Sequence, residues 1–187
     1  MMICSPLSAG TAWRAVARCI AVSIAMGVRR EIHQPRSHLG QVIGFGDGTS
    51  GRVYRETTVE RSPGKPCVLV VCFRLRGVRG RGHAVFRAES LLNTPLFVGF
   101  PGFVSKLWLA HDEQGTYRGL YEWDGADRAE HYARCLWHVL ALICEGDSID
   151  YRVLPGLSRD QFLGDPSVRR ARSPGEESAW WRVVAAA

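Results

Sequence analysis

The sequence predicts a single α+β domain in which strands and helices alternate. Its 187 residues give room for one domain with a hydrophobic core plus extensions. The segment 67–77, CVLVVCFRLRG, is a near-continuous apolar run of the kind that forms a central strand. Two later segments, 84–92 and 127–146, place apolar residues at the spacing of one helix face.

Two further strands are expected at 103–110 and 116–123, on either side of the turn HDEQG. Gly115 occupies the position of this turn where a positive φ is wanted. The segment 149–154 supplies the last strand through its two-residue alternation. The resulting order is strand, helix, strand, strand, helix, strand. This is the split βαβ arrangement (β-α-β-β-α-β) of a ferredoxin-like domain.

The domain is expected to cover 41–154 and to begin with an added N-terminal β-hairpin at 41–60, around the glycine-rich turn GFGDGTSG. This turn lacks the lysine of a phosphate-binding loop and no helix follows it, so phosphate binding is not expected there. Residues 155–187 lose clear periodicity and are interpreted as a C-terminal tail. Within this tail, Trp180 and Trp181 offer enough apolar surface to contact the domain or a partner subunit.

Residues 1–40 are interpreted as an N-terminal extension. It is either poorly structured or the product of a start placed too early, since Met26 would also serve as a start. Arginines interrupt or flank its apolar run and leave CIAVSIAMGV, a stretch too short to span a bilayer. No clean small-residue cleavage site for export follows it. We therefore expect a cytoplasmic protein with no membrane partner.

The net charge of +6 and the six cysteines narrow the class of protein. Much of the basic excess lies in short arginine groups without interleaved aromatic residues, so nucleic-acid binding is not expected. No pair of cysteines has the CxxC spacing. Scattered thiols are typical of the core of a reduced, cytoplasmic protein rather than of a disulfide framework.

A stripe of metal-binding residue types occurs on the second predicted helix. His131, Cys135 and His138 share one side of it, and zinc accepts all three residue types. The stripe is expected to face solvent, opposite Ala133 and Leu136. One helix supplies neither a fourth protein ligand nor supporting hydrogen bonds, so no metal site is expected.

Aromatic residues concentrate on the predicted hairpin at 103–123. Alternation puts Lys106 and Trp108 on one face of its first strand, opposite Phe103. The second strand places four residues on one face: Tyr117, Gly119, Tyr121 and Trp123. If the two faces coincide, flat rings surround one cation, and Gly119 leaves a gap where a further ring could sit. Such a surface suits a planar anionic ligand such as a phenolate; alternatively, the rings are core packing and Lys106 extends to the rim.

The predicted sheet has two apolar faces, of which the two helices cover only one. The other face also needs a cover, because large apolar side chains would otherwise be exposed on it. A second copy of the sheet is the usual solution, so a homodimer is expected.

Residues 101–123 read PGFVSKLWL…GTYRGLYEW, and a predicted helix that begins with DRAEHYAR follows them. These two segments resemble the small mono-oxygenases of the dimeric α+β barrel superfamily. These are relatives of the antibiotic-biosynthesis monooxygenases, and the resemblance covers 67–154. It implies two ferredoxin-like subunits packed sheet to sheet, each with a pocket between its sheet and its helices. The sequence departs from the family pattern at Arg118 and in its N-terminal hairpin.

The resemblance also implies cofactor-independent oxygenation of a small phenolic or polycyclic aromatic compound, which the protein deprotonates, orients and shields from water. His83 is then the candidate base, and Lys106 or Arg87 stabilises the anion. Candidate substrate contacts are Arg87, Glu89, Asn93, Trp108, Tyr117, Gly119, Tyr121 and Trp123. No cofactor is expected, because His83 alone does not make a haem-ligand pattern. The competing hypothesis is a non-catalytic module of the same fold that binds a small aromatic ligand or mainly dimerises.

Overall fold

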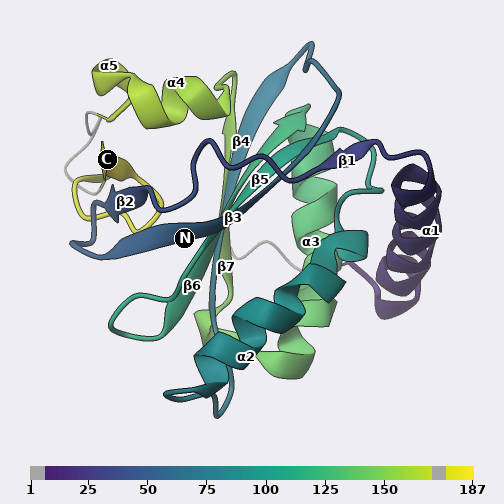
Figure 1. The fold of residues 1–187 in the computed structure, drawn as a ribbon, viewed down its shortest axis with the longest axis horizontal. Helices are drawn as coiled ribbons and strands as arrows, with labels where there is room; N and C mark the ends of the chain where they lie inside the picture. The colour runs from purple at the N-terminus through teal and green to yellow at the C-terminus, as the bar shows by residue number, and fades with distance from the viewer. Residues whose placement is uncertain (1–6, 170–175) are drawn as a thin grey trace.

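The protein has a mixed α+β architecture built on one curled antiparallel sheet (Figure 1). The computed structural model describes residues 7–169 and 176–187. Neighbouring strands follow the order β7-β4-β6-β5-β3-β2-β8, and β1 pairs with β3 outside this path. The strands are β1 (Ile32–His33), β2 (Val42–Phe45), β3 (Ser50–Val59), β4 (Pro66–Arg74), β5 (Phe103–Leu109), β6 (Thr116–Asp124), β7 (Asp150–Pro155) and β8 (Val183–Ala186). The helices are α1 (Ala9–Val28), α2 (Gly82–Glu89), α3 (Ala126–Ile143), α4 (Arg159–Gly164) and α5 (Pro166–Arg169), with short 3-10 helices η1 (Ser90–Leu96) and η2 (Gly146–Ser148).

Four strands, β4 to β7, form where the apolar run and the alternation predict them. Val68, Leu69 and Val70 of β4 are fully buried, which accounts for the continuous apolar run, because both faces of this strand are covered. β5 and β6 form the predicted hairpin, and Gly115 in its turn has a φ of +80°. The predicted positions of these strands are confirmed.

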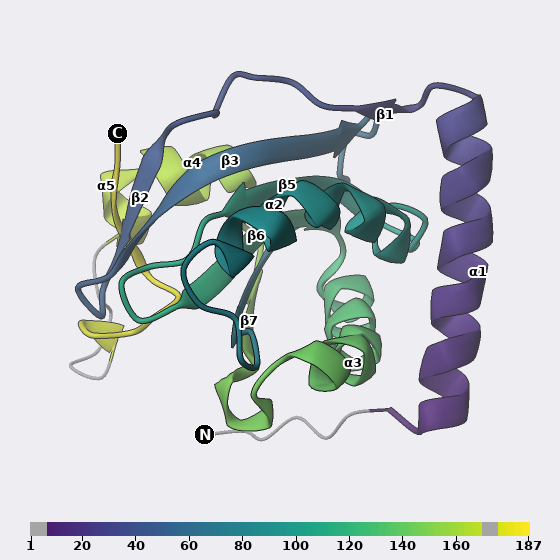
Figure 2. The ribbon, with the colours of Figure 1, turned by 60° about the horizontal axis from the view of Figure 1, so that its bottom comes forward.

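One face of the sheet is covered by helical segments, and α1 packs outside α3 and η1 (Figure 2). The N-terminal segment, interpreted from the sequence as an extension, therefore forms a helix joined to the domain. Cys19 Sγ and Ser23 Oγ donate hydrogen bonds to the carbonyl of Pro95 at 3.2 and 3.1 Å. A Cβ at Gly99 would lie 2.2 Å from the carbonyl oxygen of Cys19. Only glycine permits this close approach of the two backbones.

The C-terminal segment covers the other face of the sheet, where the sequence predicts a tail. Phe162 and Leu163 of α4 and Val183 of β8 are buried in an apolar cluster with residues of β4, β5 and β6. Trp180 and Trp181 pack against the same cluster, partly buried. The apolar face that led us to expect a homodimer is thus covered by the chain itself. The homodimer stays a prediction.

A buried ion-pair network joins segments that are distant in the sequence. The carboxylate of Glu56, whose side chain is 1% exposed, accepts hydrogen bonds from Arg159 Nη1 at 2.8 Å and from Ser37 Oγ at 3.0 Å. Nδ1 of His38 lies 2.9 Å from the same carboxylate. Burial disfavours the charged carboxylate, but the hydrogen bond with His38 and the charge of Arg159 outweigh it and lower the pKa of Glu56.

Glu56→Gln is expected to lower the free energy of unfolding by about 3 kcal/mol at neutral pH, because the Arg159 guanidinium loses its buried counter-charge. The folded-state pKa of Glu56 lies below its unfolded value. Its contribution is therefore complete above the unfolded pKa and is lost as pH falls through the folded pKa.

Urea unfolding between about pH 3 and about pH 7 measures both effects. The wild-type protein should lose stability more steeply on acidification than Glu56→Gln does. Glu60→Gln, at a carboxylate on the surface, is the control and should behave as wild type. Identical acid profiles for wild type and Glu56→Gln would contradict the prediction.

Candidate functional site

The aromatic face predicted for the β5–β6 hairpin lies on the helix-covered side of the sheet. Trp108, Tyr117, Tyr121 and Trp123 all belong to the same apolar cluster, so the two strand faces coincide as the ligand hypothesis requires. Phe103 also belongs to this cluster, although alternation places it on the opposite face from Lys106. The reason is a shift in the β5–β6 register between Phe103 and Ser105.

Lys106 lies inside a cage of aromatic rings. Its Nζ atom is 3.2 Å from the ring centre of Trp108, 4.5 Å from that of Phe97 and 4.7 Å from that of Tyr121. Within the part of the chain that the structure describes, no carboxylate forms an ion pair with it. Burial, together with the charge of Arg55, lowers the pKa of Lys106 well below its ordinary value. The amine is thus an enclosed group and does not extend to the rim.

The space that the sequence offered for a ligand is filled by the protein's own rings. A Cβ at Gly119 would lie 2.7 Å from the ring of Tyr121, so this ring takes up the gap at the glycine. Trp123 is fully buried, with its ring centre 4.8 Å from that of Tyr132. Trp108 donates its indole N–H to Thr57 Oγ1 at 3.2 Å. Contacts of this kind are those of a close-packed core.

His83 and Arg87 lie near Tyr117, at the edge of the aromatic cluster. His83 Nδ1 lies 3.0 Å from the Tyr117 hydroxyl, and the charge of Arg87 acts on the same hydroxyl. The imidazole of His111 stacks on that of His83 with ring centres 3.8 Å apart. Burial raises the pKa of Tyr117 to about 12 although Arg87 opposes the shift. Burial, His83 and Arg87 lower the pKa of His111. No pattern in the sequence distinguishes His111, which is the first residue of the predicted turn.

Two other predicted contacts, Glu89 and Asn93, are separated from this cluster. They line a groove of about 660 Å³ between the α2–η1 segment and the end of α3, together with Phe86, Leu92 and Leu142. The predicted site residues therefore fall into three groups: the buried cage around Lys106, the His83–Tyr117 edge and this groove.

His131, Cys135 and His138 of α3 do not gather into one cluster. Cys135 is fully buried, whereas the stripe was expected to face solvent. His131 Nε2 lies 3.7 Å from Cys135 Sγ, but Nε2 of His138 lies 2.6 Å from the carbonyl oxygen of Leu7. Among the residues with described positions, no group of three or more metal-binding side chains comes together.

A pocket that the sequence did not predict lies between α1 and the loop at 98–101. We call it the α1 pocket; it has a volume of about 510 Å³. The lining residues are Arg14, Ala15, Arg18, Cys19, Val22, Met26, Arg61, Val98, Gly99, Phe100, Pro101 and His131. Three of them are arginines and none carries a carboxylate. This pocket was missed because α1 was interpreted as an extension and Arg61 follows a different element.

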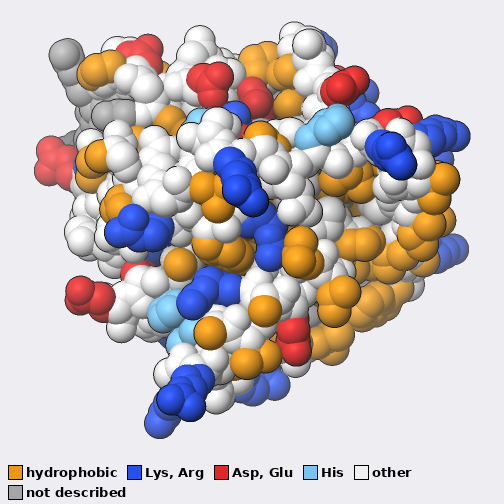
Figure 3. All heavy atoms as spheres, viewed as in Figure 1, with side chains coloured by type: hydrophobic (Ala, Val, Ile, Leu, Met, Phe, Trp, Pro, Cys, Tyr) orange, Lys and Arg blue, Asp and Glu red, His pale blue; other side chains and the backbone are white. Residues whose placement is uncertain are grey.

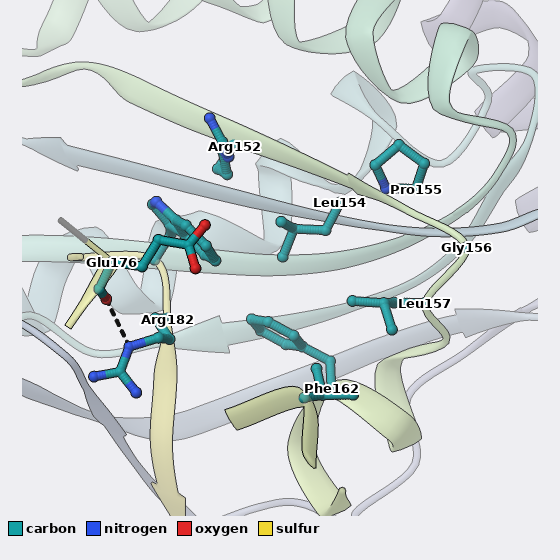
Figure 4. Close-up of a pocket in the computed structure, with 10 residues that line it drawn as sticks. Arg152, Leu154, Pro155, Gly156, Leu157, Phe162, Glu176 and Arg182 are labelled. Atoms are coloured by element: carbon teal, nitrogen blue, oxygen red, sulfur yellow. Dashed lines mark hydrogen bonds between the residues drawn. The ribbon is translucent and has the colours of Figure 1, made fainter. Parts of the chain in front are cut away.

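A smaller pocket of about 330 Å³ lies on the other face of the sheet (Figure 4). Leu154, Leu157 and Phe162 form its apolar part. The Arg152 guanidinium carbon is 5.1 Å from the ring centre of Trp181. Arg182 donates a hydrogen bond to the backbone carbonyl of Glu176 at 2.7 Å. Both guanidinium groups thus already have partners within the protein.

The chain matches no model of a known protein family and no curated protein at a significant level. The resemblance to the dimeric α+β barrel mono-oxygenases therefore stays a prediction.

Lys106→Met is expected to raise the free energy of unfolding by about 1 kcal/mol near neutral pH, because methionine fills a similar volume without a desolvated amine. The folded-state pKa of Lys106 is below its ordinary value of 10.5. The unfolded state binds the proton more strongly, so this residue makes wild-type stability rise with pH until the unfolded lysine is also neutral.

Urea unfolding at about pH 7 and about pH 9 tests this, and the variant should lose the rise. Lys65→Met, at an exposed lysine, is the control. A variant that is less stable than wild type at both pH values would identify Lys106 as a stabilising cation and overturn the prediction.

Proposed function

We propose that β4, α2, β5, β6, α3 and β7 form a ferredoxin-like unit within the larger sheet. The strand order β7-β4-β6-β5 supports this, because it places the fourth, first, third and second strands of a β-α-β-β-α-β chain side by side. All three pairings in this set are antiparallel. β3, β2 and β8 extend the sheet beyond β5.

We further propose that the protein is a non-catalytic module that binds a small amphipathic anion in the α1 pocket. The observation that carries this proposal is the meeting of Arg14, Arg18 and Arg61 around an apolar cavity whose lining residues include no carboxylate. Three guanidinium groups without a neighbouring counter-charge favour an anion.

The three arginines are held differently. Arg14 Nε donates to the carbonyl of Gly10 at 3.2 Å, and Arg61 Nη1 donates to the carbonyl of Phe103 at 2.9 Å. These backbone bonds orient the two side chains and leave their other N–H groups available. Arg18 has no ion pair or hydrogen bond with any residue that the structure describes. It is therefore the arginine whose donors are most available to a ligand.

The apolar part of the cavity determines the rest of the ligand. Val22, Met26 and Phe100 line it, so an aliphatic or aromatic body fits beside the guanidinium groups. A volume of about 510 Å³ lies within the range typical of sites for small molecules. The ligand class is thus a carboxylate, phosphate or sulfonate attached to an apolar group.

The cage of aromatic rings around Lys106 is less suitable for this ligand. Lys106 lines neither the α1 pocket nor the other two cavities, of about 660 and 330 Å³. Burial also lowers the pKa of Lys106 well below its ordinary value, which weakens the attraction of its amine for an anion. The rings are better explained as the core on which α1 and the loop at 98–101 rest.

Isothermal titration with 2-naphthoate and decyl phosphate, and with the uncharged 2-naphthalenemethanol and decanol, tests the proposal. The anions should bind at least about tenfold more tightly than their neutral counterparts, and Arg18→Gln should remove most of that difference. Arg79→Gln, at an exposed arginine that lines neither the α1 pocket nor the other two cavities, is the matched control. Absence of binding by both anions, or an equal loss in the control, would refute the proposal.

The second candidate function is the oxygenation of a phenolic compound implied by the family resemblance. It is favoured by the His83–Tyr117 contact, since an imidazole and the Arg87 guanidinium there surround a phenol group. The raised pKa of Tyr117 is evidence against it, because these surroundings do not favour a phenolate.

Oxygen uptake with a panel of phenols and quinols tests this second candidate. If it is correct, His83→Ala should lower the rate by about 100-fold or more. His33→Ala, at a half-exposed histidine outside the cluster, should not change it. A flat response of the wild-type protein across the panel would exclude the activity for these compounds.

A further inference from the structure

The outer face of α1 is an apolar stripe open to solvent. We define this face by Trp13, Ala17, Ile24 and Val28, which follow one another at helical spacing and are all exposed. The exposed fractions are 44% for Trp13, 60% for Ile24 and 80% for Val28. Hydrophobic side chains gather along the right-hand side of the molecule, where α1 lies (Figure 3). An exposed stripe of this kind is typical of a docking surface.

The opposite side of α1 fixes the orientation of this face. Ala12, Val16, Cys19 and Ser23 are buried against the rest of the domain. In Figure 2, α1 stands as the outermost element on its side of the molecule. The helix therefore lies along the surface of the domain with its outer face directed away from the core.

The charged side chains of α1 are all positive, and further arginines follow its end. The segment Ala9–Val28 contains no acidic residue, and Arg14 and Arg18 lie beside the outer face. Arg29 and Arg30 follow directly at its end. Of these four arginines, Arg29 is near a carboxylate, that of Glu31 at 3.9 Å, and this pair is exposed. A basic border around an apolar stripe is complementary to an anionic surface with a hydrocarbon interior.

The helix is also unusually apolar for one at a protein surface. Among the described residues, α1 is the one helix long and apolar enough to cross a membrane by length and composition. Because its other side is packed against the domain, it is arranged to lie in a membrane surface rather than to span it. Trp13 is of the residue type that favours the boundary between headgroups and hydrocarbon.

We propose that the outer face of α1 docks the protein onto an anionic lipid bilayer, with the helix parallel to the membrane plane. This departs from the expectation of no membrane partner, which considered only whether the run at 19–28 could span a bilayer. The proposal shares Arg14 and Arg18 with the α1 pocket but rests on the apolar outer face, none of whose four residues lines that pocket.

Co-sedimentation of the full chain with vesicles tests the proposal. The vesicles contain phosphatidylcholine alone or with about one third phosphatidylglycerol. Wild type should pellet with the anionic vesicles and should bind the neutral vesicles at least about tenfold more weakly. The reason is that each basic residue near an anionic surface strengthens binding about fivefold. Ile24→Glu should lower the partition coefficient for anionic vesicles by at least about tenfold.

Matched variants separate the membrane face from other effects. Leu142→Glu changes a residue that is 64% exposed on α3 and should bind vesicles as wild type does. Val28→Ser is a second variant of the face and should weaken binding without adding a charge; circular dichroism confirms that each variant is folded. Arg18→Gln tests the pocket separately by titration with decyl phosphate, so failure of one proposal is distinguishable from failure of the other.

Two outcomes would overturn the proposal. The first is wild type that does not pellet with anionic vesicles, or an equal loss of binding in Leu142→Glu. The second is a wild-type protein that is a dimer in solution, does not bind vesicles and becomes a monomer in the Ile24→Glu variant. This result would assign the outer face of α1 to a second copy of the chain.

Discussion

The sheet must be covered on both faces, and the rest of the structure depends on this requirement. Leu69 and Val71 of β4 point into the cluster beneath the helices, whereas Val68 and Val70 point into the cluster beneath α4 and β8. A strand buried on both sides is stable only when something apolar packs on each side. The helices between the strands supply one cover and the C-terminal segment supplies the other, so one chain meets the requirement alone.

Local periodicity was enough to place the elements whose own residues carry a clear pattern. The apolar run predicts β4, the turn with Gly115 predicts the β5–β6 hairpin, and apolar spacing predicts α3. Periodicity could not reveal the register shift after Phe103, because a bulge leaves no mark in a two-residue alternation. It also could not reveal where α1 packs, since the contact between Cys19 and Gly99 joins segments far apart in the chain.

The candidate site was predictable in composition but not in shape. Alternation correctly brings Lys106 and Trp108 to the face that carries Tyr121. Whether that face is open depends on the rotamer of Tyr121, whose ring occupies the space at Gly119, and a rotamer is not visible in the sequence. The α1 pocket forms because α1 lies near Arg61, which follows β3. No spacing in the sequence predicts that these two segments lie close together.

The pairing of β2 with β8 has a consequence for how the protein is made. Ile43 pairs with Ala186 and Gly44 with Ala185, so one side of β2 has no partner until a segment synthesised much later is available. An unpaired strand edge binds other strands readily, and the second apolar face of the sheet stays uncovered for the same period. The nascent chain on the ribosome therefore carries an incomplete sheet until β8 has been synthesised. A chain that stops before β8 exposes this strand edge, which is the kind of edge that favours aggregation.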